Sequence, residues 1–486
     1  MRTAGLLMAV SSLPSQYGIG DFGKGCEDFI DFLADCKISI WQILPLNPLG
    51  YGNSPYQPYS SFAGDPLYIS LEKLFEEGLL KEVPPAFRED ASQTDYDSVR
   101  KYKETYLKEA FAAFSPDGAY EEFVKMDWVY PYAVFSSLKK ANDLKCWNEW
   151  KPEHRDWIKD RKADISEYEE AIAYEMFLQY KFYTQWKQVK ALANEKGIRI
   201  MGDIPFYVGI DSVDVWMNQE EFLLGADAKP TFIAGVPPDY FSAVGQRWGN
   251  PIYNWAHMEE NQFAFWMKRF GYTASLFDIV RIDHFRAFDT YWKIPASCET
   301  AIEGEWIEAP GYALFDTLLR TYPDACIVAE DLGDMRPEVY ELRDHYSFPG
   351  MKIIQFTFDP LEDNNSFPDR ENMIVYTGTH DNETILGWFE NQPEEVQVST
   401  DRKLAELGYK EGTIAQRFLR YTCDNIADTA IIPVQDLLEL DNCGRFNTPG
   451  TIGSPNWEWR LADFCALNER KAFLQELLEG SRRVNK

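Results

Sequence analysis

The chain has 486 residues, and its 78 Asp and Glu against 48 Lys and Arg give a formal net charge of −30. No basic block interrupts this acidic excess, which argues against binding to nucleic acid or to an anionic membrane, because both require a positive surface. The length suits a (β/α)8 barrel of about 250 residues that carries insertions. The eight cysteines form no Cys-x-x-Cys pair, which is typical of free thiols in a reducing compartment. We therefore expect a cytoplasmic protein.

The amino-terminal segment has one feature of a secretory signal, since Arg2 precedes the apolar stretch Ala4–Val10. The stretch is at the short limit for a signal peptide, and the residues after it contain no convincing cleavage site. No apolar run approaches the ~20 residues needed to cross a bilayer. The stretch is therefore interpreted as the first strand of the fold.

Short apolar, β-branched runs bounded by turn residues recur along the whole chain and are typical of buried strands. Helical periodicity separates most of them, as at Asp28–Leu33 and at Glu167–Glu195, where Gly197 is the expected helix stop. This alternation predicts an α/β fold, a (β/α)8 TIM barrel that forms one catalytic domain over residues 1–486. The expected strands are Gly5–Val10, Ile38–Pro45, Ile198–Asp203, Phe277–Ile282, Ala325–Ala329, Met351–Phe358, Met373–Thr377 and Thr429–Val434.

The gaps between the expected strands are uneven, and this unevenness locates the insertions. The longest gaps predict insertions at about 52–190 and about 205–275, which we expect to form helical subdomains around the carboxyl-terminal mouth of the barrel. No internal repeat or low-complexity linker divides the chain.

Three acidic residues, Asp283, Glu330 and Asp381, each stand directly after one of the expected strands. Roughly 50 residues separate each acid from the next, which is one or two strand-plus-helix units of a barrel. Acids at the ends of different barrel strands meet at one mouth. Two carboxyl groups that flank one bond, with a third nearby, are the catalytic groups that break a glycosidic bond.

The neighbours of the first acid suggest its role. Arg281 and Asp283 are two residues apart in a strand, so their side chains share a face, and a nearby arginine favours an ionised aspartate suited to nucleophilic attack. The alternative is a structural ion pair inside the barrel.

The other two acids also have a structural alternative. Glu330 ends an apolar strand beside Asp331, a setting that raises a carboxyl pKa and suits a proton donor. Asp381 lies among polar neighbours and is suited to binding sugar hydroxyls and stabilising a positive transition state. For both positions the alternative is the capping of a following helix, a role that Asp331 or Asp334 could fill near Glu330.

Two aromatic segments are candidates for substrate contact. Gly235–Pro251 has neither helical nor strand periodicity, and it contains Tyr240, Phe241 and Trp248. Long ordered loops of this kind are often functional lids. Gly50–Tyr59 is a similar aromatic loop after a strand. Both segments are expected at the mouth, where aromatic rings stack on sugars and exclude water.

Cofactor and metal chemistry have no support in the sequence. No phosphate-binding Gly-x-x-x-x-Gly-Lys-Ser/Thr loop occurs, and no Gly-x-Gly-x-x-Gly follows a strand. Among the five histidines no pair has metal-ligand spacing. We expect neither a cofactor nor a metal.

Several phrases taken together resemble the amylomaltases, which are 4-α-glucanotransferases (disproportionating enzymes) of the wider α-amylase clan. The resemblance runs in the family's order from about residue 5 to residue 457. The phrases are Tyr51-Gly-Asn-Ser-Pro-Tyr-Gln57, Gly202-Asp-Ile-Pro205, Gly235-Val-Pro-Pro-Asp-Tyr-Phe241, Gly245-Gln-Arg-Trp-Gly-Asn-Pro251, Arg281-Ile-Asp-His-Phe-Arg286, Ala329-Glu-Asp-Leu-Gly333 and Gly378-Thr-His-Asp-Asn382.

This resemblance implies a (β/α)8 barrel and a retaining double displacement on α-1,4-glucans. Asp283 takes the position of the nucleophile, Glu330 that of the acid/base and Asp381 that of the transition-state stabiliser. Ala287 departs from the family, which commonly has glycine there. The implied substrate-binding residues are Tyr56, Asp203, Tyr240, Phe241, Trp248, Arg281, His284 and His380.

The expected partners are an α-1,4-glucan or maltooligosaccharide donor and a glucose or maltooligosaccharide acceptor, with no nucleic acid and no membrane. Starch, glycogen and maltodextrin metabolism are the matching settings. The nearest alternative is an α-amylase-like hydrolase of the same glucans. An alternative of another class is a non-catalytic glucan-binding protein, which is expected to lack at least one of the three acids.

Overall fold

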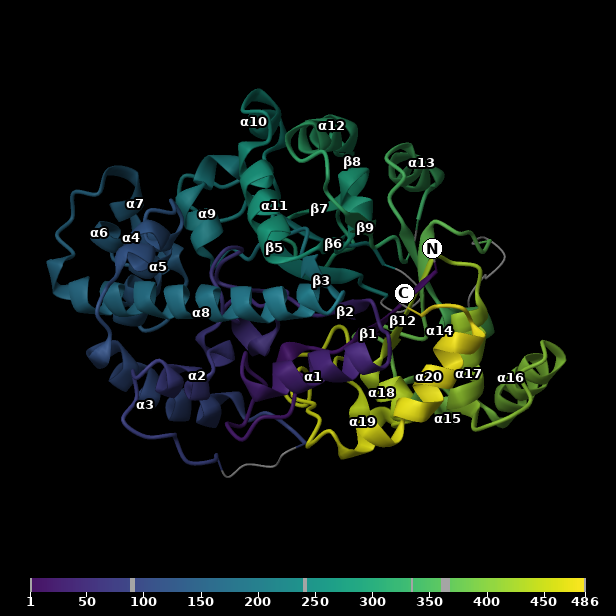
Figure 1. The fold of residues 1–486 in the computed structure, drawn as a ribbon. Coiled ribbons are helices and arrows are strands. Elements are labelled where there is room, and N and C mark those ends of the chain that lie inside the picture. The colour runs from purple at the N-terminus through teal and green to yellow at the C-terminus, as the bar shows by residue number, and fades with distance from the viewer. Residues whose placement is uncertain (1, 88–91, 239–242, 334, 360–367, 485–486) are drawn as a thin grey trace.

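Eight parallel strands form the central sheet of the computed structural model, which describes residues 2–87, 92–238, 243–333, 335–359 and 368–484 (Figure 1). Their order is β10-β11-β12-β1-β2-β3-β6-β9, so neighbours in space mostly follow one another in the chain. The strands are β1 (Thr3–Leu7), β2 (Ile40–Gln42), β3 (Arg199–Ile204), β6 (Ile279–Ile282), β9 (Ile327–Ala329), β10 (Gly350–Ile353), β11 (Met373–Tyr376) and β12 (Thr429–Pro433).

The two edges of this sheet meet and nearly close it into a barrel. The amide of Ala329, the last residue of β9, donates to the carbonyl of Pro349, which precedes β10, at 2.9 Å. One or two apolar side chains from every strand fill the interior, as expected for a packed barrel rather than a pore. These are Leu7, Ile40, Met201, Ile279, Val328, Met351, Ile353, Ile374, Tyr376 and Ile431.

All eight expected strands are present, and the TIM-barrel prediction is confirmed. Their lengths differ from the prediction, most clearly at Met351–Phe358. There the strand ends at Ile353, and the helix α14 (Ile354–Phe358) follows at once. A short buried apolar run fits either conformation, so its composition could not locate this boundary.

Amphipathic helices cover the outside of the barrel. In α1 (Lys24–Asp35) the buried residues Cys26, Phe29, Ile30 and Leu33 recur at helical spacing and pack on the strands. The expected helix at Glu167–Glu195 is found as α8 (Glu169–Glu195). The other helices after barrel strands are α11 (Ala264–Leu276), α12 (Gly311–Thr321), α13 (Pro337–His345), α15 (Ile385–Asn391), α16 (Glu394–Glu406), α17 (Ile414–Asp424), α18 (Val434–Leu437), α19 (Cys465–Glu469) and α20 (Lys471–Gly480).

The segment between β2 and β3 is helical and lies to one side of the barrel, opposite α16 to α20 (Figure 1). The Glu175, Gln179 and Gln185 side chains of α8 are buried there, and Gln179 bonds the backbone of Gly64 in both directions. The helices of this segment before α8 are α2 (Leu71–Glu76), α3 (Tyr96–Ala113), α4 (Gly118–Phe123), α5 (Val129–Ala141), α6 (Pro152–Arg155) and α7 (Trp157–Asp160).

A second sheet of four antiparallel strands, in the order β5-β4-β7-β8, stands beside the barrel. None of its four strands was expected, and Gly235–Pro251, which contains β5 and the end of β4, was interpreted as a loop without strand character. The sheet exists because β4 pairs with β5 on one side and with β7 on the other, and local periodicity cannot reveal the contact with the distant β7. Its strands are β4 (Phe232–Val236), β5 (Gln246–Pro251), β7 (Thr290–Pro295) and β8 (Glu305–Glu308), with the short helices α9 (Val213–Met217) and α10 (Trp255–Glu260) nearby.

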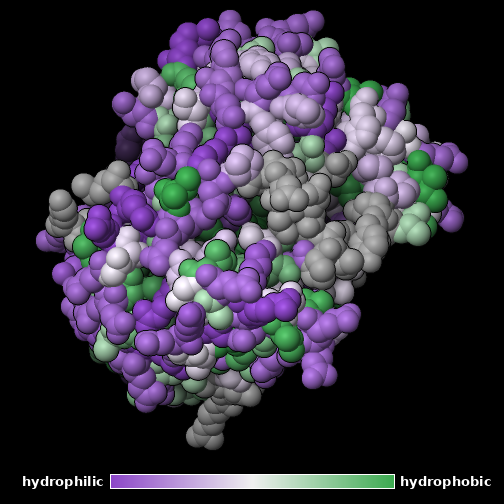
Figure 2. Space-filling model, turned by 90° about the vertical axis from the view of Figure 1, so that its right-hand side faces the viewer, coloured by the Kyte–Doolittle hydropathy of each residue, from purple (hydrophilic) through white to green (hydrophobic). Residues whose placement is uncertain are grey.

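The two ends of the chain lie side by side (Figure 1), where the fully buried Arg483 donates to the carbonyl of Thr3 at 3.0 Å. The face drawn in Figure 2 is mostly hydrophilic, with scattered hydrophobic patches. None of the helices in the described residues has the length and apolar character needed to span a membrane.

Candidate active site

Asp203 and Arg281 point into the carboxyl-terminal mouth of the barrel. Met201 and Ile279 belong to the barrel interior. Asp203 and Arg281 lie two residues further along the same strands and therefore share the inward face. The two strands pair with Asp203 opposite Arg281, so the parallel register of β3 and β6 sets the aspartate directly beside the guanidinium.

Arg281 is the centre of a buried network. Its Nη1 lies 2.5 Å from Oδ2 of Asp203 and 3.1 Å from Oδ1 of Asp283, and the hydroxyl of Tyr56 donates to Asp203 at 2.7 Å. Burial raises the pKa of Asp203, while the charge of Arg281 opposes that rise. The ion pair considered as a structural alternative does exist, and it also holds Asp283 at the mouth.

Glu330 follows β9 and is held by two backbone amides. Oε2 accepts from the amide of His284 at 2.7 Å, and Oε1 accepts from the amide of Leu332 at 3.1 Å. Burial raises the pKa of Glu330 to about 8, and the negative charge of Asp283 adds to the rise against the opposing charge of Arg281. Glu330 is therefore protonated at neutral pH, the state that a proton donor requires.

The alternative of helix capping does not apply to Glu330 or Asp331. Asp331 is buried and accepts from Arg343 and from the amide of Met351, so it joins β9 to α13 and β10. The N-cap position of α13 is Arg336. The proposed alternative Asp334 lies outside the described residues.

Asp381 follows β11 and is positioned by a segment near the carboxyl terminus. Nδ2 of Asn447 donates to its Oδ1 at 2.7 Å, and Nη2 of Arg445 donates to its backbone carbonyl at 3.1 Å. Burial by itself raises the pKa of Asp381, but the neighbouring His380 and the Asn447 hydrogen bond outweigh it and lower the pKa to about 2. The cap of the following helix is Thr384, so the capping alternative fails for Asp381 as well.

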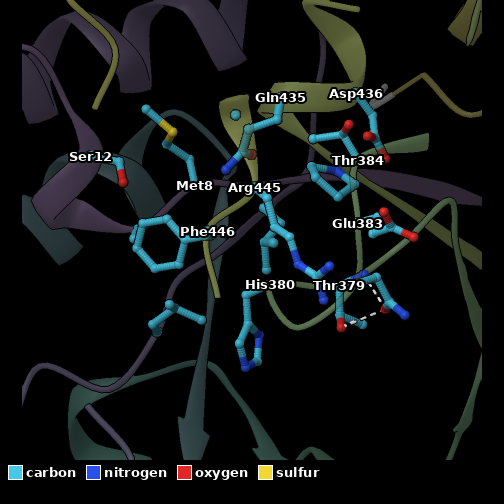
Figure 3. Close-up of a pocket in the computed structure, with 16 residues that line it drawn as sticks. Met8, Ser12, Thr379, His380, Glu383, Thr384, Gln435, Asp436, Arg445 and Phe446 are labelled. Carbon is cyan, nitrogen blue, oxygen red and sulfur yellow. Dashed lines mark hydrogen bonds between the residues drawn. The ribbon is translucent and has the colours of Figure 1, made fainter. Parts of the chain in front are cut away.

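Behind this loop lies a small cavity of about 20 Å³, room for about one water molecule. Figure 3 shows Arg445 reaching from one side of the cavity toward the loop that carries Thr379 and His380. Asp436 also lines the cavity, and it accepts from the Thr377 hydroxyl and the amide of Ile385.

Aromatic rings surround the carboxylates. The Tyr56 ring stacks on His380 with centroids 5.0 Å apart, and Trp248 meets His284 edge to face at the same distance. Burial lowers the pKa of His284 to about 4, so its imidazole is neutral at pH 7. Nε2 of His380 lies 3.3 Å from Oδ2 of Asp381.

The structure thus joins nine of the expected site residues into two sets of contacts that meet at the adjacent residues Asp283 and His284. The remaining two, Tyr240 and Phe241, lie outside the described residues. The joined residues are Tyr56, Asp203, Trp248, Arg281, Asp283, His284, Glu330, His380 and Asp381.

Sequence reasoning missed Asn447 and Arg445. They stand in the polar, glycine-rich stretch around residues 442–456, which follows no expected strand. Their approach to Asp381 depends on the return of the chain across the barrel mouth. The only local signal was a stretch of Asn, Thr, Pro and Gly residues typical of an ordered turn.

No group of three or more His, Cys, Asp or Glu side chains that could hold a metal occurs among the residues the structure describes. The eight cysteines are all unpaired.

Comparison with known proteins identifies the family. The 4-alpha-glucanotransferase family of glycoside hydrolases (family 77) matches residues 8–466, which is most of the chain. The chain belongs to this family. Its activity is that of a 4-α-glucanotransferase acting on α-glucans, and this separates it from the α-amylase-like hydrolase and from the non-catalytic binding protein considered as alternatives.

Individual members of the family align with the chain over nearly their whole length. The 4-alpha-glucanotransferase of Thermus thermophilus is 41% identical over 502 aligned positions, which cover 99% of both chains. That of Synechocystis is 43% identical, with 94% of each chain covered. The structure of the amylomaltase from Streptococcus agalactiae in complex with acarbose superimposes with a TM-score of 0.94 at 37% identity and covers all of both chains.

Proposed function

We propose that this 4-α-glucanotransferase moves a segment of an α-1,4-glucan to the 4-hydroxyl of glucose or a maltooligosaccharide by a retaining double displacement. The observation that carries the proposal is that two acids at the barrel mouth are held in opposite protonation states. Glu330 has its pKa raised to about 8 and is held as an acid, whereas Asp283 is paired with Arg281 as a carboxylate. Paired carboxyl groups in these two states are what retaining transfer requires.

In the first step Asp283 attacks the anomeric carbon while the glycosidic bond to the departing chain breaks. Glu330 gives its proton to the departing oxygen, so the products are a glycosyl ester on Asp283, a free 4-hydroxyl on the departing chain and an ionised Glu330. Asp381 remains anionic because its pKa is about 2, and it stabilises the positive charge that develops on the sugar.

In the second step an acceptor takes the place of the departed chain. Its 4-hydroxyl loses a proton to Glu330 and attacks the anomeric carbon, which releases Asp283. The ring of Tyr56 and the neutral imidazole of His284 line the sugar-binding side of these acids. Transfer dominates over hydrolysis when the acceptor reaches the intermediate before water does.

The assignment of the nucleophile is tested with Asp283→Asn. The substitution removes the attacking oxyanion while preserving side-chain volume, so we expect turnover of maltotriose to fall at least about 10³-fold. Normal turnover by Asp283→Asn would contradict the assignment.

The donor and acceptor are tested with maltotriose alone, followed over time. Transfer produces glucose and a ladder of longer maltodextrins with a constant number of reducing ends. A steady increase in reducing ends would instead indicate hydrolysis.

Free thiols at all eight cysteines support a reducing compartment, so we place this reaction in the cytoplasm.

A further inference from the structure

Trp306 differs from the other tryptophans of the chain in its exposure to solvent. Its side chain is 39% exposed, whereas the other 14 of the 15 tryptophans are buried or half-buried, and all 15 lie in the described residues. Tryptophan carries a large apolar surface whose exposure to water is unfavourable. An exposed tryptophan is therefore a candidate contact surface.

The Trp306 ring has one covered face. The guanidinium carbon of Arg286 lies 4.0 Å from the ring centroid, which places the cation over one face of the ring. Trp292 meets the ring at a centroid distance of 5.2 Å with an interplanar angle of 64°, so the two rings are not stacked face to face. Neither neighbour encloses the indole, which remains 39% exposed.

The ring is also held in a fixed position. Trp306 belongs to β8, which pairs only with β7 in its sheet, and Trp306 stands opposite Trp292 in that pairing. Nε1 of Trp292 donates to the carbonyl of Ala301 at 2.9 Å. A ring anchored in this way loses little conformational entropy when it binds a ligand.

This surface lies beside the catalytic centre, on the side of Glu330. Arg286 belongs to the 3-10 helix Phe285–Phe288, which follows His284 directly. The amide of Phe285 donates to the carbonyl of Glu330 at 3.0 Å. Trp306 stands on β8, at the opposite edge of the four-stranded sheet from β5, whose Trp248 contacts His284.

We propose that Trp306 is a stacking platform for one glucose ring of a long α-1,4-glucan whose reacting end lies in the catalytic centre. The proposal rests on the role of Glu330 proposed above. The acid that protonates the departing chain faces that chain, and the acceptor later occupies the same place, so the platform serves both.

The chemistry of the surface favours this occupant. A glucose ring is uncharged and presents an apolar C–H face, so it suits an exposed indole on a chain of net charge −30. Glu308 lies two residues further along β8 and shares the face of Trp306, and its exposed carboxylate is an acceptor for sugar hydroxyls.

The first test compares a long and a short substrate. Chains of three glucose units are too short to reach a second surface, whereas amylose is long enough. We expect Trp306→Ala to raise KM for amylose about fivefold, the loss of one aromatic contact, and to change kcat/KM for maltotriose less than about twofold. Trp306→Phe keeps a flat ring and is expected to restore most of the affinity for amylose.

The second test measures binding without turnover. In the Asp283→Asn background, migration through a native gel containing amylose reports affinity, and Trp306→Ala is expected to reduce the retardation. Tyr312→Ala is the matched control, because Tyr312 is a 48% exposed aromatic residue on α12.

Two results would overturn the proposal. One is unchanged amylose affinity in Trp306→Ala. The other is an equal loss on amylose and maltotriose that Trp306→Phe fails to restore, which would assign Trp306 a purely structural role as the cover of Arg286. Failure of the proposed reaction itself is a separate outcome, since the unsubstituted enzyme would then form no ladder from maltotriose.

Discussion

Asn447 donates a hydrogen bond from Nδ2 to Oδ1 of Asp381 at 2.7 Å, although the two residues are 66 positions apart in the chain. The bond satisfies one oxygen of the stabilising carboxylate and contributes to its low pKa. Arg445, two residues earlier, fixes the backbone of Asp381 from the same segment. A catalytic acid supplied by one strand end is thus oriented by a distant part of the chain.

Asn447→Ala is expected to lower kcat/KM for maltotriose by about 10- to 100-fold. This factor corresponds to the free energy of one hydrogen bond to a charged group. The pKa of Asp381 rises when this donor is lost, so the acid limb of the pH profile moves to higher pH. Steady-state kinetics between pH 4 and 9 measure both effects. Asn391→Ala, at an exposed site on α15, is the control and should behave as the unsubstituted enzyme.

The pH dependence of the first step reports on Glu330. Its pKa is about 8, and the proton donor is active only while protonated, so kcat/KM should fall as the pH rises through about 8. Glu330→Gln cannot donate a proton and should lose about 10²- to 10⁴-fold in rate, together with this basic limb. A basic limb that persists unchanged in Glu330→Gln would assign it to another group.

Asp436 is predicted to lower stability as it ionises. Burial raises its pKa to about 6 in the folded protein, against about 3.9 in an unfolded chain, so the folded state holds the proton more tightly. The contribution of this group is therefore most favourable below about pH 4 and is lost as the pH rises to about 6, by roughly 3 kcal/mol.

Asp436→Asn keeps an acceptor for the amide of Ile385 and cannot ionise. The stability of this variant relative to the unsubstituted protein should increase between pH 4 and 6.5, as measured by urea unfolding at each pH. The exposed Asp428→Asn is the control. A constant difference across this range would contradict the prediction.

Arg483 is predicted to hold the carboxyl-terminal end against the barrel. It is fully buried and donates to the carbonyls of Thr3, Cys423, Asn425, Ala427 and Asp428. Arg483→Met leaves these carbonyls without their donor and should destabilise the protein by about 3 kcal/mol or more, with kcat on maltotriose unchanged below the new unfolding midpoint. Its exposed neighbour offers the control Arg482→Met, which should leave the thermal midpoint in place.

Ala287 departs from the glycine common in the family, and its conformation explains why alanine is accepted. It lies in a 3-10 helix and is not among the residues with positive φ, so glycine is not required. Ala287→Gly should cost about 1 kcal/mol in unfolding free energy without changing kcat. An increase in stability or a large change in kcat would contradict this account.

Local patterns were sufficient to predict the barrel and its acids. Each strand is a short buried run, and an acid that follows such a run, like Glu330 or Asp381, points to the carboxyl-terminal mouth because all parallel strands end there. The same reasoning located the Arg281 and Asp283 pair. It failed at the four strands of the second sheet, where β4 and β5 come from a segment without alternation and β4 pairs with β5 and β7.

The sequence by itself therefore determined which side chains enter the mouth, since strand periodicity and strand order decide the direction of each residue. Only the tertiary structure decided the pKa values of those side chains. The high pKa of Glu330 and the low pKa of Asp381 arise from burial, from neighbouring charges and from Asn447, contributed by segments far apart in the chain. Electrostatic energies depend on distances of a few ångströms in space, and those distances exist only after the barrel has closed.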